Sequence, residues 1–292
     1  MGKTNKEYEP VVGSTMSLGD HLEELRTRIL LALAGLALAF ILCLVFGKQI
    51  ISFAKWPYVT AVTQVLEEEA REQAKDEQQT GSASEQIPKP IDVSREVILT
   101  TLAPAEVIIS YIKICLISGL LLSSPWVFYQ LWMFVAAGLY PHERRYVNVA
   151  APFSALLFIA GALFFLSIVA PICLKFFIKS SDILGLSRNW TLQYYITFIS
   201  HMMLIFGLAF QTPSAIFFLN RTGLVSLKAF SDARKYVVLG IVIIAAMATP
   251  PDVVSQIALA VPLYFLFELG IILSWLAARQ RSKSEDSNQA NG

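Results

Sequence analysis

The sequence predicts an all-α integral membrane protein with six transmembrane helices, cytoplasmic termini, and short fifth and sixth spans. Apolar residues occupy 55% of the 292 positions, more than a soluble domain of this size needs. Long apolar blocks alternate with polar connections, and a helix needs about 20 apolar residues to cross the hydrocarbon core. The net charge is only +1, so no basic field for nucleic acid is expected.

The first span continues a helix that begins in polar sequence. Residues 1–16 are polar and are expected to form a flexible tail. Ser17 and Asp20 are spaced as a capping pair, and apolar residues then recur at helical spacing into a span at about 29–46. No cleavage site follows this apolar block, so we expect it to be retained rather than removed as a signal peptide.

The six spans belong to one predicted transmembrane domain over residues 17–276. The later spans are expected at about 106–135, 146–172, 194–219, 236–249 and 253–275. The fifth, with about fourteen residues, is too short for a full hydrocarbon core. Either the bilayer is thinned there or neighbouring helices shield the helix. We favour thinning because a mismatch between helix length and bilayer thickness costs little free energy. Pro250, Pro251 and Asp252 form a structural break before the sixth span.

Lysine and arginine counts predict the orientation. The side with the N-terminus, the connections at 138–145 and 220–235, and a cytoplasmic tail at 277–292 holds 13 basic residues. The opposite side holds 9, mostly in one long loop, which counts less. That loop contains a polar stretch at 67–90, interpreted as a solvated helix followed by a flexible segment, an insertion without an essential role.

Two charged clusters lie at the predicted inner ends of spans. In the first, Glu24 and Arg28 stand four apart and Glu23 and Arg26 three apart, which is typical of helix-surface ion pairs. The second, at 140–145, has two arginines that would pin its loop inside. When each cluster is considered alone, a structural role explains it better than a functional role does.

No catalytic or metal-binding set is evident. His21 and His142 lack the second histidine of a zinc-protease motif, and no nucleotide-binding or nucleophile-elbow motif occurs. The three cysteines lack disulfide or zinc spacing. We therefore expect no enzyme activity, no cofactor and no metal.

Several polar residues lie inside the predicted spans. Lys113 is expected to extend outward, toward Glu106 on the same helix face. A carboxyl group as deep as Glu268 should be neutral, paired or facing a wet cavity. Gln211 is the other deep polar residue.

Taken together and in order, these segments resemble TatC, the multispanning signal-peptide receptor subunit of the twin-arginine protein translocase. The matching stretches are 21–28, 124–134, 139–145, 210–213, 249–256 and 267–270. The resemblance extends over about residues 18–275, and the inner-loop and double-proline motifs are its most specific parts.

The resemblance implies a signal-peptide site. It implies that Glu24 and Glu143 bind the paired arginines of an export signal, each carboxylate accepting one rigid guanidinium fork. It also assigns Arg26, Arg144, Phe134 and Tyr140 to that site.

The resemblance further implies that Pro57 shapes the first outer loop. Gln211, Thr249 and Gln256 are candidates for binding single-span partner subunits, because polar groups hold helices together in lipid. Gln211 departs from the glutamate of many relatives, so a hydrogen-bonding role is expected there rather than a charged one.

The sequence leaves three functions to compare. The leading one is a non-enzymatic receptor in the bacterial inner membrane that works with TatA- and TatB-type subunits and other copies of itself. Energy would come from the proton gradient, as the family implies. The alternative is an ion- or proton-coupled small-molecule transporter using Glu268 and Gln211, which should show an internal repeat that we do not find. An intramembrane enzyme lacks its catalytic set.

Overall fold

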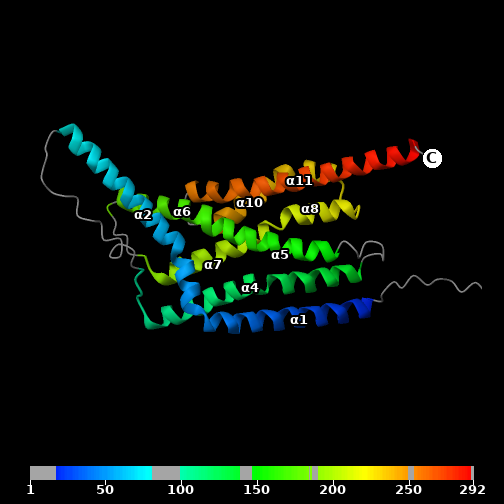
Figure 1. Cartoon of the computed structure of the whole chain (residues 1–292), viewed down its shortest axis with the longest axis horizontal. Helices are drawn as coiled ribbons and strands as arrows, with labels where there is room; N and C mark the ends of the chain where they lie inside the picture. The colour runs from blue at the N-terminus through cyan, green and yellow to red at the C-terminus, as the bar shows by residue number, and fades with distance from the viewer. Residues whose placement is uncertain are drawn as a thin grey trace, which may run out of the picture.

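Helices make up nearly all of the regular structure. The computed structural model describes residues 18–80, 99–138, 147–183, 185, 190–248 and 253–290. Within these residues no strand occurs, and the nearest to one is an isolated parallel bridge between Thr100 and Thr191. Figure 1 shows most of the helices running side by side along the long axis of the molecule.

The helices, in chain order, are α1 (Leu18–Val45), α2 (Gly47–Thr80), α4 (Pro104–Ala137), α5 (Val147–Phe164), the π-helical turn η2 (Phe165–Val169), α6 (Ala170–Ile183), α7 (Leu192–Ala209), α8 (Thr212–Arg221), α9 (Leu227–Asp232), α10 (Arg234–Ala248) and α11 (Val253–Ala290). Five stretches are long and apolar enough to cross a membrane: Leu22–Val45, Pro104–Ala137, Asn148–Ile183, Leu192–Arg221 and Val253–Arg279. The predicted all-helical class is therefore confirmed.

The predicted fifth span corresponds to α10, which has 15 residues and is not among those five stretches. Every residue of α10 lies in the described part of the chain, and of these only Ala245 is buried. The helix packs chiefly against α11. Neighbouring helices in the described part of this chain therefore shield little of α10.

Two predicted spans are built from more than one helix. The third runs beyond its predicted end near 172 to Ile183, through the π-helical turn η2. In that turn the N–H of Ala170 donates to the carbonyl of Phe165, five residues back. The wider turn lies directly before Pro171, which has no N–H to donate. The fourth span is interrupted between α7 and α8, where Pro213 occupies the first turn of a new helix.

Helices α1 and α4 approach closely because small residues lie at their contact. A Cβ added at Gly119 would lie 3.0 Å from the backbone N and Cα of Phe40. A Cβ at Gly35 would lie 2.3 Å from the indole of Trp126, whose Nε1 donates to the carbonyl of Leu31 at 2.9 Å. Close backbone approach at small residues is a common source of helix association in lipid.

The chain after α1, predicted to be an outer loop, is largely a helix. Figure 1 shows α2 projecting away from the other helices. Its buried residues recur at helical spacing, Ala54, Tyr58, Ala61 and Val65, and the helix packs on α6. Pro57 lies buried inside α2 and not in a loop. It withholds one helical hydrogen bond there.

The polar stretch at 67–90 begins inside α2, which continues to Thr80. Its remaining residues lie outside the described part of the chain. Glu68 forms ion pairs with Lys175 and Lys179 of α6, the second at 2.6 Å. The helical part of this stretch is therefore docked on a neighbour as well as solvated.

The ion pairs of Glu68 predict a pH dependence. Hydrogen bonds from Lys175 and then Lys179 lower the pKa of Glu68 from 4.5 to about 2. Because the pKa of Glu68 is lower in the folded state, its ion pairs stabilise the folded protein fully above about pH 4.5. This stabilisation is lost as the pH falls toward 2. Hydrogen-exchange protection of α2 should stay constant down to about pH 5 and then fall. Glu68→Gln should remove the step, and a wild-type profile without a step would contradict the assignment.

Because α1 packs closely on α4, a larger side chain at their contact should lower the stability of the protein, whereas one at an open position should not. Gly119→Val should lower the free energy of unfolding in detergent by about 1–3 kcal/mol, because the backbone of Phe40 cannot move aside. Gly240→Val in α10 is the matched control, since a Cβ there meets nothing within 4 Å. Equal melting temperatures for the two variants would show that the contact is loose.

Candidate functional site

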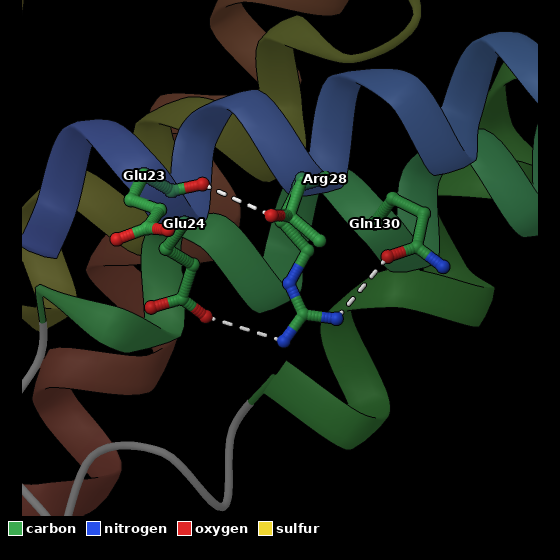
Figure 2. A network of polar contacts seen from close by, with 5 residues as sticks. Glu23, Glu24, Arg28 and Gln130 are labelled. Atoms are coloured by element: carbon green, nitrogen blue, oxygen red, sulfur yellow. Dashed lines mark hydrogen bonds and ion pairs between the residues drawn. The ribbon is translucent and has the colours of Figure 1, made fainter.

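A small acidic cavity lies near the N-terminal end of α1. It has a volume of about 420 Å³ and is lined by Glu23, Glu24, Thr27 and Arg28. Thr27 stands four residues after Glu23, and Arg28 four residues after Glu24. Side chains four apart are neighbours on a helix surface, so the local fold alone brings each pair together. Figure 2 shows the carboxylate of Glu24 beside the guanidinium of Arg28, whereas the carboxylate of Glu23 points away from it.

Arg28 links this cavity to the neighbouring helix α4. Its Nη2 donates to Oε1 of Glu24 at 3.2 Å, and its Nη1 donates to Oε1 of Gln130 at 3.3 Å (Figure 2). The side chains of Glu24 and Arg28 are 21% and 24% exposed, whereas Gln130 is buried. Arg28 Nε is buried and makes no hydrogen bond within the described residues.

The arrangement can bind a cation that donates hydrogen bonds. A carboxylate has two oxygens that accept a guanidinium fork, and such charge-assisted pairs are stronger than neutral hydrogen bonds. Arg28 contacts only one oxygen of Glu24. Glu23 forms no ion pair with a described residue and is exposed, so it adds a second negative charge to the cavity.

The two helix-surface pairs predicted for this segment have different outcomes. The pair between Glu24 and Arg28 is confirmed. No ion pair joins Glu23 to Arg26 in this part of the structure, and Arg26 is exposed and does not line the cavity.

Other residues predicted for this site lie partly outside the described chain. Tyr140, Glu143 and Arg144 fall in 139–146, which is not described. Phe134 is half-buried near the end of α4. In Figure 1 the end of α4 and the start of α5 lie at the same end of the bundle as the start of α1.

The predicted partner-binding residues are dispersed. Gln211 lies between α7 and α8, where its Nε2 donates to the carbonyl of Ser154 at 2.7 Å. Gln256 Nε2 donates to the carbonyl of Val242 at 3.3 Å and so links α11 to α10. Thr249, Pro250, Pro251 and Asp252 lie outside the described residues.

The carboxylate of Glu268 is paired, which is one of the three arrangements expected for a carboxyl group inside a span. Arg234 approaches it through Nε at 2.9 Å and through Nη2 at 3.0 Å, and the hydroxyl of Tyr264 donates to it at 2.8 Å. This bidentate contact joins the start of α10 to the middle of α11.

The predicted approach of Lys113 to Glu106 is wrong. Lys113 Nζ donates to Oγ1 of Thr197 at 2.9 Å. Glu106 instead accepts the backbone N–H of Leu102 at 2.7 Å, at the start of α4. The carboxylate of Glu106 therefore bonds a free backbone N–H that is close to it in sequence, and not Lys113.

Sequence reasoning missed the role of Gln130 and gave Arg28 only a structural one. The spacing of Glu24 and Arg28 was a visible signal, but Gln130 is 102 residues away in sequence from Arg28. No group of three or more His, Cys, Asp or Glu side chains in the described chain could hold a metal ion.

These features define a multispanning helical membrane protein with an acidic cavity at one end of its bundle. The family model for the Sec-independent protein translocase protein (TatC) matches residues 20–262. The chain belongs to this family, which confirms the resemblance found in the sequence and places the protein in protein translocation.

Known relatives cover almost the whole chain. A Listeria innocua protein named Sec-independent protein translocase protein TatC is 32% identical over 92% of this chain and 95% of its own length. A relative of the same name from Aquifex aeolicus is 30% identical over 92% of this chain and 98% of its own length. The crystal structure of a twin-arginine translocase receptor, TatC, matches with a TM-score of 0.70 at 29% identity, covering 88% of this chain and 99% of that one.

Proposed function

We propose that this chain is the core receptor of a twin-arginine translocase. It binds the paired arginines of export signal peptides and assembles with partner subunits to move folded proteins across the membrane. The observation that carries this proposal is the partly buried carboxylate of Glu24, which lies beside Glu23 in a cavity at one end of the bundle.

The chemistry of the cavity suits arginine. A guanidinium is planar, always charged and presents paired donors, whereas a lysine ammonium is a point charge on a flexible stem. Glu24 on α1 takes one arginine of the signal peptide. Glu143, in the segment between α4 and α5, takes the other. Arg26, Arg144, Phe134 and Tyr140 complete the site around the peptide.

The orientation and surroundings follow from this role. The protein lies in the bacterial cytoplasmic membrane with six spans, α10 included, and with both termini in the cytoplasm. The acidic cavity then faces the compartment in which precursors are made. The proton gradient supplies the energy.

Single-span TatA- and TatB-type subunits bind beside α10 in this proposal, and other copies of the chain join the same assembly. Support comes from an apolar groove of about 1180 Å³ at the other end of the bundle, between α6, α7 and α10. Its α10 wall consists of Ile244, Met247 and Ala248, directly before Thr249. A membrane-spanning partner helix fits such a surface, and polar residues at its edges add hydrogen bonds.

Gln211 and Gln256 do not line this groove, and they are suited to bond a partner helix elsewhere on the bundle. Each uses its amide Nε2 within the chain, and neither carbonyl Oε1 has a hydrogen-bond partner among the described residues. An amide oxygen without a protein donor is an acceptor for a partner side chain in lipid.

Nothing favours the alternative of an ion-coupled transporter. That function needs an exchangeable carboxyl group inside the membrane. Glu268 is held by the permanent charge of Arg234 through two contacts, and Gln211 does not titrate.

The receptor role is tested at the two carboxylates. Glu24→Gln and Glu143→Gln should each abolish export of a twin-arginine precursor while the protein remains inserted, because each removes the charge that pairs with one guanidinium. Export is measured in cells, and a photocrosslinker beside each position reports contact with a signal peptide that carries or lacks its two arginines. Wild-type export by both variants would refute the role.

The partner-binding role is tested at Gln211. Gln211→Leu should reduce co-purification of single-span partners, because it removes the acceptor Oε1. Gln211→Glu is the matched comparison, since it loses the donor to Ser154 but keeps an acceptor. If both variants lower the melting temperature equally and neither changes partner recovery, Gln211 serves only the contact between α7, α8 and α5.

A further inference from the structure

We infer that Arg28 is a resident counter-ion that occupies Glu24 until an arginine of the signal peptide displaces it, and so sets the affinity that a cationic ligand must reach. This inference rests on the proposed function and concerns the control of that same site.

The geometry of the contact between Arg28 and Glu24 allows another guanidinium to displace Arg28. A guanidinium has five N–H donors in a fixed fork and can bind a carboxylate through two of them. Arg28 instead makes one contact of 3.2 Å to one oxygen of Glu24. Its Nε is buried without a hydrogen-bond partner among the described residues. An incoming arginine that binds through two donors therefore forms the better pair.

Gln130 provides Arg28 with a contact that does not depend on Glu24. Gln130 is 2% exposed and is fixed on α4, and its Oε1 accepts from Nη1 of Arg28 at 3.3 Å. Because the side chain of Arg28 is 24% exposed, donors released from Glu24 can reach water. The displaced guanidinium thus remains solvated and held, which keeps the cost of exchange low.

The resident charge also accounts for a demand for two arginines. A single arginine that displaces Arg28 exchanges one guanidinium–carboxylate pair for another, so it gains only the difference between a two-donor contact and a one-donor contact. The second arginine must then supply the gain in free energy. An internal competitor lowers the apparent affinity of every cationic ligand by the same factor. Ligands that bind weakly, such as a signal peptide with a lysine pair, therefore occupy the site too rarely to be recognised.

The charges around the exchange are of both signs. Glu23 lies in the same cavity, and Arg26 is exposed on the same helix. Removing the positive charge of Arg28 leaves the negative charge of Glu23 and Glu24 unopposed within the cavity. An approaching cation is then attracted more strongly, because no resident positive charge offsets these carboxylates.

The test is the affinity of purified protein in lipid nanodiscs for a fluorescent twin-arginine signal peptide. Arg28→Gln should raise that affinity at least about threefold, and should raise the affinity for a lysine–lysine version by a similar factor. Unchanged or weaker binding of the twin-arginine peptide by Arg28→Gln would overturn the inference, because Arg28 would then be neutral or would position Glu24.

Two further variants keep the result interpretable. Arg28→Lys keeps the charge but cannot hold Glu24 and Gln130 through one fork, so it should give a smaller rise. If Arg28→Gln does not fold, weaker binding by Arg28→Lys than by wild type overturns the inference instead. Arg279→Gln, on α11, makes the same change in net charge outside the cavity and should leave the affinity unchanged.

The two hypotheses fail in different ways. If wild type and Glu24→Gln bind the peptide equally well, the proposed function is wrong. If wild type binds, Glu24→Gln loses binding and Arg28→Gln gains nothing, only the role of Arg28 is wrong.

Discussion

The close contact of α1 with α4 is the constraint on which the acidic cavity depends. Gly119 lets the two backbones meet, and Gly35 makes room for the indole of Trp126, which fixes their register through the carbonyl of Leu31. At this separation Arg28 of α1 reaches Gln130 of α4. Without that neighbour, Glu24 and Arg28 would form an ordinary exposed helix pair of small energetic value. The packing turns them into an ordered, partly buried site.

The opposite end of the bundle is tied by different means. The backbone of Thr100 exchanges two hydrogen bonds of 2.9 Å with Trp190 and Leu192, which joins the start of α4 to the start of α7. The hydroxyl of Tyr195 donates to the carbonyl of Ala54 in α2 at 2.6 Å. These directional polar contacts add to apolar packing at the same end, where Tyr58, Leu192 and Tyr195 belong to the main core.

Sequence reasoning found the helices that hydropathy controls and missed those that tertiary contacts control. The long apolar blocks had to be helices, because lipid offers the backbone no hydrogen bonds. The sequence predicts a loop over the part of α2 before residue 67, where no long apolar block occurs, although Ala54, Tyr58, Ala61 and Val65 repeat at helical spacing. The pair of Glu24 and Arg28 was readable from spacing alone. Gln130 was not, since only the packing of α1 on α4 brings it within reach.

The π-helical turn at Phe165–Val169 also fixes the direction in which α6 presents its charged side chains. A wide turn holds more residues than an α-helical one, and each residue in a helix advances the next by about 100° around the axis. The direction of Lys175 and Lys179 toward Glu68 therefore depends on how many residues that turn contains. A homologue shorter by one residue there could keep an equally apolar span and still orient both lysines toward lipid.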